Sequence, residues 1–144
     1  MACYRATIQS KKSPDEAFEY LADFAHAREW DPGVVEGENL TGQPIGPDSR
    51  FRLVARFLGL QVPLEYRISI FEPPRRVVFQ ADQDAVRSTD EIRVVPVGAG
   101  TSVTYDADLR LKGPLGRLMD PLLGLAFRRI GDRAAVGLGK ALNL

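Results

Sequence analysis

The chain has 144 residues, 44% of them apolar, which is enough for one globular domain over residues 1–144 with a single sizeable core. Nineteen Lys and Arg residues balance nineteen Asp and Glu residues, so the totals show no basic field for binding nucleic acid. The single Cys excludes an internal disulfide, and with only one His the sequence also excludes a Cys/His zinc cluster.

The N-terminus predicts that the protein stays where it is made. It reads Met-Ala-Cys-Tyr-Arg-Ala and contains no apolar signal region. The longest apolar run, residues 122–127, is too short to cross a bilayer. We therefore expect a cytoplasmic protein without an integral membrane segment.

The first elements are a strand and two short helices. Residues 3–10 alternate in polarity and predict the strand. A helix start follows, because serine at the N-cap (Ser13), proline at the first helical position (Pro14) and glutamate at the third (Glu16) form a capping box. A second helical piece, around residues 24–30, is expected to end before Pro32, since the residue preceding a proline is disfavoured in the α conformation.

From about Val34 the apolar period changes to two, which predicts about six antiparallel strands in a meander. Residues 50–57 and 61–70 alternate on either side of Gly59 and predict a hairpin with one apolar face. Further strands are predicted at residues 77–81, 88–94 and 103–111.

The residues after Gly113-Pro114 predict one long amphipathic helix. Its apolar row, at every fourth position, is Leu118, Leu122, Ala126, Ile130, Ala134, Leu138 and Leu142. Asp120-Pro121 interrupts this row, so the helix either begins there or bends there. Four glycines between residues 124 and 139 each cost about 1 kcal/mol in a helix interior, so packing on the sheet must stabilise the helix. They permit either a close approach to the sheet or movement of the helix as a lid.

This order of elements predicts an α+β fold. A curved antiparallel sheet of six or seven strands carries two short helices after its first strand and the long C-terminal helix over its concave face. Such a sheet is strongly twisted, and one straight helix cannot fill its concavity. A cavity is therefore expected unless large side chains close it.

Two segments resemble a known family. Residues 13–24 (SPDEAFEYLADF), followed by residues 29–34 (EWDPGV), are similar to the polyketide cyclase/dehydrase branch of the START-like superfamily, also called SRPBCC. Residues 71–79 and 100–105 support the resemblance, which covers nearly the whole chain. It implies a helix-grip fold with a pocket for lipids, sterols, quinones or aromatic polyketides. It implies no single reaction, because members include binders, cyclases and regulators.

The candidate ligand-binding residues are those in phase with the concave face. On the strands they are Leu53, Ala55, Phe57, Leu64, Tyr66, Ile68, Phe79, Asp90, Ile92, Tyr105, Ala107 and Leu109. On the helix they are Leu118, Met119, Leu122 and Ala126. Trp30 is expected at the pocket mouth, where it either lines the ligand site or packs the short helices onto the sheet. The alternative for the whole set is a filled core.

Asp90 is the first candidate for chemistry, because it lies in phase with Ile92 and burial would raise its pKa toward the range useful for proton transfer. The alternative is a wet strand end, or a bulge that shifts its phase. Tyr66 and Tyr105 either orient a ligand carbonyl or are core tyrosines with satisfied hydroxyls. Asp31 is expected to be a helix-end or turn residue, and His26 is a weak catalytic candidate.

No phosphate loop, HExxH or GxSxG motif is present, so we predict no metal and no cofactor. Three functions stay open. The first is binding of a hydrophobic small molecule, and the second is a polyketide aromatase/cyclase or dehydratase that uses the pocket aspartate and tyrosines. The third is a protein-interaction domain without a small ligand. The sequence leaves open the identity of the ligand and the choice between monomer and homodimer.

Overall fold

The computed structural model describes the backbone of residues 2–57 and 59–143, and the side chains of residues 3–56, 59–114 and 124–143. Strand β1 (Ala2–Ser10) is followed by helix α1 (Pro14–Ala22), the 3-10 helix η1 (Phe24–His26) and helix α2 (Ala27–Trp30). Six strands and one long helix follow: β2 (Val34–Asn39), β3 (Arg50–Phe57), β4 (Leu60–Glu72), β5 (Arg76–Asp82), β6 (Val86–Val97), β7 (Gly100–Leu111) and α3 (Pro114–Leu142).

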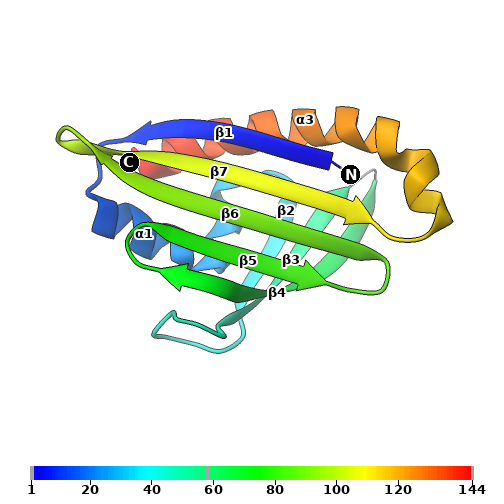
Figure 1. Ribbon diagram of the computed structural model, residues 1–144, viewed down its shortest axis with the longest axis horizontal. Helices are drawn as coiled ribbons and strands as arrows, with labels where there is room; N and C mark the ends of the chain where they lie inside the picture. Colours follow the sequence, from blue (N-terminus) through cyan, green and yellow to red (C-terminus); the bar gives the residue numbers. More distant parts are fainter. Residues whose placement is uncertain (1, 58, 144) are drawn as a thin grey trace.

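The seven strands form one antiparallel sheet in the order β1-β7-β6-β5-β4-β3-β2. The chain therefore crosses from one edge strand to the other through α1, η1 and α2, and returns as a meander. Figure 1 shows α3 running alongside β1, with α1 near the end of the sheet where the chain's C-terminus lies. This arrangement confirms the predicted α+β helix-grip fold.

Local signals in the sequence account for the short helices. The Ser13 hydroxyl accepts a hydrogen bond from the Glu16 N–H at 3.2 Å, so the predicted N-cap is formed. Helix α1 then buries Phe18 and Leu21 against the sheet. Helix α2 ends at Trp30, and Asp31, the residue before Pro32, has extended dihedral angles.

A bulge in β4 changes one part of the predicted pattern. The pairing of β4 with β5 shifts register between Ile68 and Ile70. Phe71 therefore points inward, where its ring lies 5.7 Å from that of Phe18, and Ile70 lies with Val78 on the outer face. The alternation expected through Ile70 is correct only as far as Ile68, because a bulge adds one residue to a strand and reverses the faces beyond it.

Helix α3 begins at Pro114, so it does not begin at Asp120-Pro121. Figure 1 shows its first turns set at an angle to the rest, as expected for a proline inside a helix. Two of its glycines permit close packing: a Cβ at Gly131 would overlap the Tyr4 ring, and one at Gly137 would overlap the Trp30 carbonyl. Among the described residues, no helix has both the length and the apolar character needed to span a membrane.

Candidate functional site

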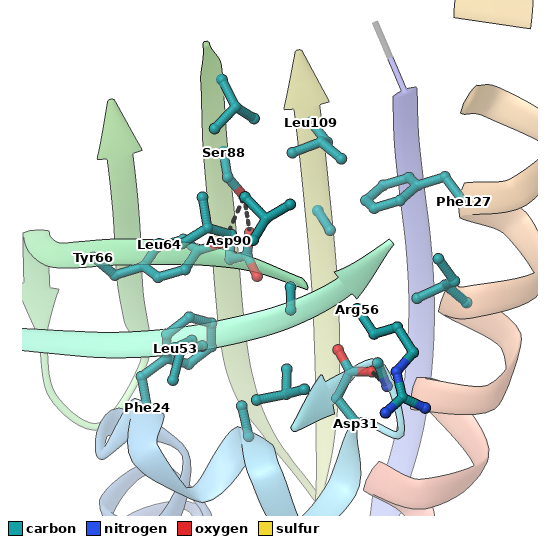
Figure 2. A pocket seen from close by; sticks show the side chains of 18 of the residues that line it. Phe24, Asp31, Leu53, Arg56, Leu64, Tyr66, Ser88, Asp90, Leu109 and Phe127 are labelled. Atoms are coloured by element: carbon teal, nitrogen blue, oxygen red, sulfur yellow. Dashed lines mark hydrogen bonds between the residues drawn. The ribbon is translucent and has the colours of Figure 1, made fainter. Parts of the chain in front are cut away.

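A cavity of about 220 Å³ lies between the concave face of the sheet, the short helices and α3. Figure 2 shows side chains from the strands, from the short helices and from α3 pointing into this space. Most of the wall is apolar. The predicted site residues that border the cavity are Trp30, Leu53, Ala55, Leu64, Tyr66, Asp90, Tyr105, Ala107 and Leu109.

Other predicted lining residues are buried elsewhere. Ile68, Phe79 and Ile92 are at most 2% exposed, yet they do not border the cavity. The reason is Phe24 of η1, whose ring stacks on that of Phe79 at 4.0 Å and fills this end of the concavity. Ala126 on α3 is only partly buried and also lies outside the cavity wall.

The side chains of four predicted lining residues lie outside the described residues. They are Phe57, Leu118, Met119 and Leu122. Their backbones belong to β3 and to the first part of α3. Among the described side chains of α3, those of Phe127 and Ile130 border the cavity.

Four polar side chains form one buried hydrogen-bonded chain across three strands. The Tyr66 hydroxyl donates to Ser88 Oγ at 2.7 Å, and the Ser88 hydroxyl donates to Asp90 Oδ1 at 3.3 Å. The Tyr105 hydroxyl donates to Asp90 Oδ2 at 2.6 Å. All four residues border the cavity, and Figure 2 shows Ser88, Asp90 and Tyr66 meeting on one side of it. We name this set the Asp90 chain.

Burial controls the ionisation of the Asp90 chain. Removal from water raises the pKa of Asp90 to about 7; the hydrogen bonds from Tyr105 and Ser88 oppose this rise, and the nearby charge of Asp31 adds to it. Burial also raises the pKa values of Tyr66 and Tyr105 well above 10, so both hydroxyls keep their protons at neutral pH. Asp90 can therefore accept or release a proton near neutrality, at a position open to a bound molecule.

Asp31 supplies a second carboxyl group to the wall. Its Oδ1 accepts a hydrogen bond from the Gly33 N–H at 2.8 Å, which makes it the turn residue that the sequence predicts. Burial raises the pKa of Asp31 to about 6, and the hydrogen bond from the Gly33 N–H offsets only part of this rise. Figure 2 places Asp31 beside Arg56, away from the Asp90 chain. Within the described residues, no three His, Cys, Asp or Glu side chains are grouped to hold a metal ion.

Trp30 lies at the cavity and also packs α2 against neighbouring elements. It borders the cavity, and its ring packs edge-on against that of Tyr105 at 5.4 Å. Its carbonyl also lies against Gly137 of α3. His26 lies outside the cavity wall, where it stacks on Tyr20 at 4.5 Å and its Nδ1 lies 2.7 Å from the Tyr20 carbonyl oxygen.

The remaining wall residues were not predicted as site residues. They are Phe24, Ala27, Asp31, Gly33, Val34, Arg56, Val62, Ala85, Val86, Ser88, Leu111, Phe127 and Ile130. Ser88 had a usable signal, because it precedes Asp90 by two residues and so shares its face of the strand. Gly33, Ala85 and Arg56 had none, because they border the cavity from turns or from the outward phase of a strand.

The seven-stranded antiparallel sheet, the long C-terminal helix and the cavity between them define a helix-grip domain. The chain belongs to the family described as polyketide cyclase / dehydrase and lipid transport, whose model matches residues 1–143. This confirms the family resemblance predicted from the sequence. Among curated proteins, none matches the chain.

Solved structures with low sequence identity share the fold. A START superfamily protein from Mycobacterium smegmatis is 18% identical, with a TM-score of 0.75 over 99% of this chain and 97% of its own. A Thermus thermophilus protein is 20% identical, with a TM-score of 0.80 over 97% and 96%. The Zhui aromatase/cyclase from a Streptomyces species is 17% identical, with a TM-score of 0.73 over 97% and 92%.

Proposed function

We propose that this protein binds a hydrophobic small molecule, of the lipid, quinone or aromatic polyketide type, in the cavity between the sheet and α3. The observation that carries the proposal is the cavity itself, whose wall is mostly apolar and whose polar groups are confined to a few positions. Such walls are typical of small-molecule sites. The family description, which includes lipid transport, supports the same function.

The driving force for binding would be apolar burial. Each Å² of apolar surface removed from water contributes about 25 cal/mol before the costs of association. Leu53, Leu64 and Leu109 supply such surface from three strands, and Phe127 supplies it from α3. The Asp90 chain would then orient the ligand rather than provide most of its affinity.

Native mass spectrometry of the purified protein, followed by extraction, tests this proposal. We expect an apolar ligand to accompany the wild type and to be lost from Ala107→Leu, whose larger side chain takes up part of the cavity from β7. The control Ala99→Leu adds the same volume at an exposed turn and should keep the ligand. Absence of any ligand after exposure to lipid, quinone and polyketide pools would count against the proposal, as would equal occupancy of both variants.

One observation favours a second candidate, proton transfer on a bound polyketide. The Asp90 carboxyl and the Tyr105 hydroxyl are 2.6 Å apart and both border the cavity. A carboxyl whose pKa is raised to about 7 is suited to exchange a proton at neutral pH, and a tyrosine hydroxyl can stabilise a developing enolate. The Zhui aromatase/cyclase shares the fold.

The double variant Asp90→Asn/Tyr105→Phe tests the second candidate. If the pair transfers protons, turnover of a candidate poly-β-ketone should fall by at least about a hundredfold, the size of a typical general acid–base contribution. The binding affinity for an unreactive analogue should change much less. Unchanged turnover in the double variant would remove the catalytic role and leave the binding function.

A further inference from the structure

Among the charged groups of the described cavity wall, carboxyl groups outnumber cations. The wall contains two carboxyl groups, Asp31 and Asp90, on different elements. Among the described wall residues Arg56 is the single cation, and its side chain is exposed. A ligand that enters the cavity therefore meets two carboxyl groups, and the described cation of the wall, Arg56, lies beside Asp31 with its side chain exposed to solvent.

The hydroxyl groups of the wall tyrosines and serine already donate their protons in hydrogen bonds to other wall residues. Tyr66 donates to Ser88, while Ser88 and Tyr105 both donate to Asp90. When Asp90 is ionised, the Asp90 chain offers lone pairs to a ligand but no free proton. A ligand anion would find no donor there to replace the water that it loses on entry.

Asp31 has an oxygen that a ligand can reach. Its Oδ1 is occupied by the Gly33 N–H, and no donor among the described residues contacts Oδ2. Every fully buried polar side-chain atom that the structure describes has a partner, so Oδ2 must keep accessible surface. Because Asp31 borders the cavity, this oxygen is an acceptor for a bound molecule.

We infer that the cavity selects apolar ligands whose polar end donates a hydrogen bond to Asp31, as a hydroxyl or an ammonium group does, and rejects ligands that end in a carboxylate. This inference rests on the proposed binding function and narrows its ligand class. It favours alcohols, phenols and amines over fatty acids, which have comparable apolar bodies. Its physical basis is that like charges and unpaired anions are costly where water is excluded.

Three probes with one apolar body test the inference: 2-naphthol, 2-naphthylmethylammonium and 2-naphthoate. Their affinities for the full chain are measured by calorimetry at about pH 8, where Asp31 and Asp90, with pKa values of about 6 and about 7, are ionised. We expect naphthol and the ammonium probe to bind at least about tenfold more tightly than naphthoate. Equal or tighter binding of naphthoate would overturn the inference and leave the proposed function intact.

The variant Asp31→Asn locates the selectivity. It keeps a side-chain oxygen for the Gly33 N–H but removes the charge, so the preference against naphthoate should shrink several-fold. Asp48→Asn is the matched control, because Asp48 is exposed, lies outside the cavity wall, and has a φ of 69° that asparagine tolerates. An unchanged preference in Asp31→Asn would contradict the role of Asp31.

The wild type provides a second measurement that does not depend on a variant. The titratable groups that face Asp31 across the cavity are Asp90, Tyr66 and Tyr105, and Arg56 lies beside it. Only the two carboxyls change charge between about pH 8 and pH 5.5, where naphthoate stays ionised. Naphthoate should bind several-fold more tightly at the lower pH, and no change would overturn the inference. Failure of all three probes to bind would count against the proposed function itself.

Discussion

The two ends of the concave face differ in how they are filled. At one end, aromatic rings from η1, β3 and β5 pack together: Phe24 stacks on Phe79 at 4.0 Å, and Phe51 meets Phe79 edge-on at 5.9 Å. At the other end, small side chains such as Ala55 and Ala107 face the cavity. Strand β3 supplies both Phe51 and Ala55, so the size of the inward side chains, as well as the curvature of the sheet, decides where the molecule is hollow.

Helix α3 shows the same division along its length. Ala134, Leu138 and Leu142 are at most 4% exposed and pack against the sheet. The Ser10 hydroxyl fixes this end by donating to the Leu142 carbonyl at 2.7 Å. Phe127 and Ile130, further toward the start of the helix, border the cavity instead. The described part of the helix thus packs closely on one end of the sheet and borders the cavity at the other.

The largest expected effect is a loss of stability when the aromatic packing at the filled end is removed. Phe79→Ala should destabilise the protein by about 3–5 kcal/mol, because it removes a completely buried ring between Phe24 and Phe51. Leu64→Ala, at a side chain that already borders the cavity, should cost about 2 kcal/mol, the lower end of the range for such changes. Urea unfolding of both variants measures the difference. Equal losses would show that the two ends do not differ in packing.

Much of the fold could be predicted because its signals are local. The capping box at Ser13 depends on residues three apart, and the strands depend on a period of two. The inward phase of Asp90 and Tyr105 follows from the same period, and the antiparallel pairing of β6 with β7 brings their strands together. These features need no knowledge of how distant elements pack.

The extent of the cavity could not be predicted, because it depends on contacts between distant segments. The ring of Phe24 covers Phe79 and so keeps it from bordering the cavity, yet the two residues lie 55 positions apart in the sequence. The position of the bulge after Ile68 could not be read from the alternation of apolar residues, which continues through Ile70 before the adjacent Phe71 breaks it. Asp31 has the sequence context of a turn residue, and only the packing of α2 against β2 and α3 places it on the wall.

The next effect concerns pH and the polar side of the hollow end. Burial raises the pKa of Asp90 from 3.8 to about 7 in the folded state. At a pH between these two pKa values, Asp90 is protonated in the folded protein and ionised in the unfolded chain. The contribution of Asp90 to stability is therefore fully present below about pH 4 and is lost as pH rises through about 7. Asp31, with a pKa raised to about 6, acts in the same direction.

Asp90→Asn should remove this pH dependence in part. Between about pH 4 and pH 8, the free energy of unfolding of the wild type should fall by roughly 2–4 kcal/mol more than that of the variant. The size follows because one pKa unit corresponds to about 1.4 kcal/mol. Urea unfolding at a series of pH values measures both curves. Asp48→Asn, at an exposed loop, should follow the wild type. Parallel curves for the wild type and Asp90→Asn would show that Asp90 ionises normally.

A smaller effect tests how α3 closes the packed end. Gly137→Ala should destabilise the protein by about 1–3 kcal/mol, because its new Cβ would overlap the Trp30 carbonyl and force the backbones apart. Gly139→Ala, two residues along the same helix, meets only the Ile8 side chain at 3.7 Å and should stabilise by up to about 1 kcal/mol. Thermal unfolding compares the two. Equal shifts would mean that the approach to Trp30 is not tight.

The smallest effect compares one substitution at two inward alanines. Ala81 on β5 is completely buried and lies outside the cavity wall, whereas Ala107 on β7 borders the cavity. Ala81→Leu should cost about 1–3 kcal/mol, because a filled site has no room for three more carbons. Ala107→Leu should change stability by less than about 0.5 kcal/mol, since its side chain enters open space and gains apolar burial. Urea unfolding of the ligand-free proteins measures both; a cost at Ala107 equal to that at Ala81 would mean that the space beside β7 is closed in solution.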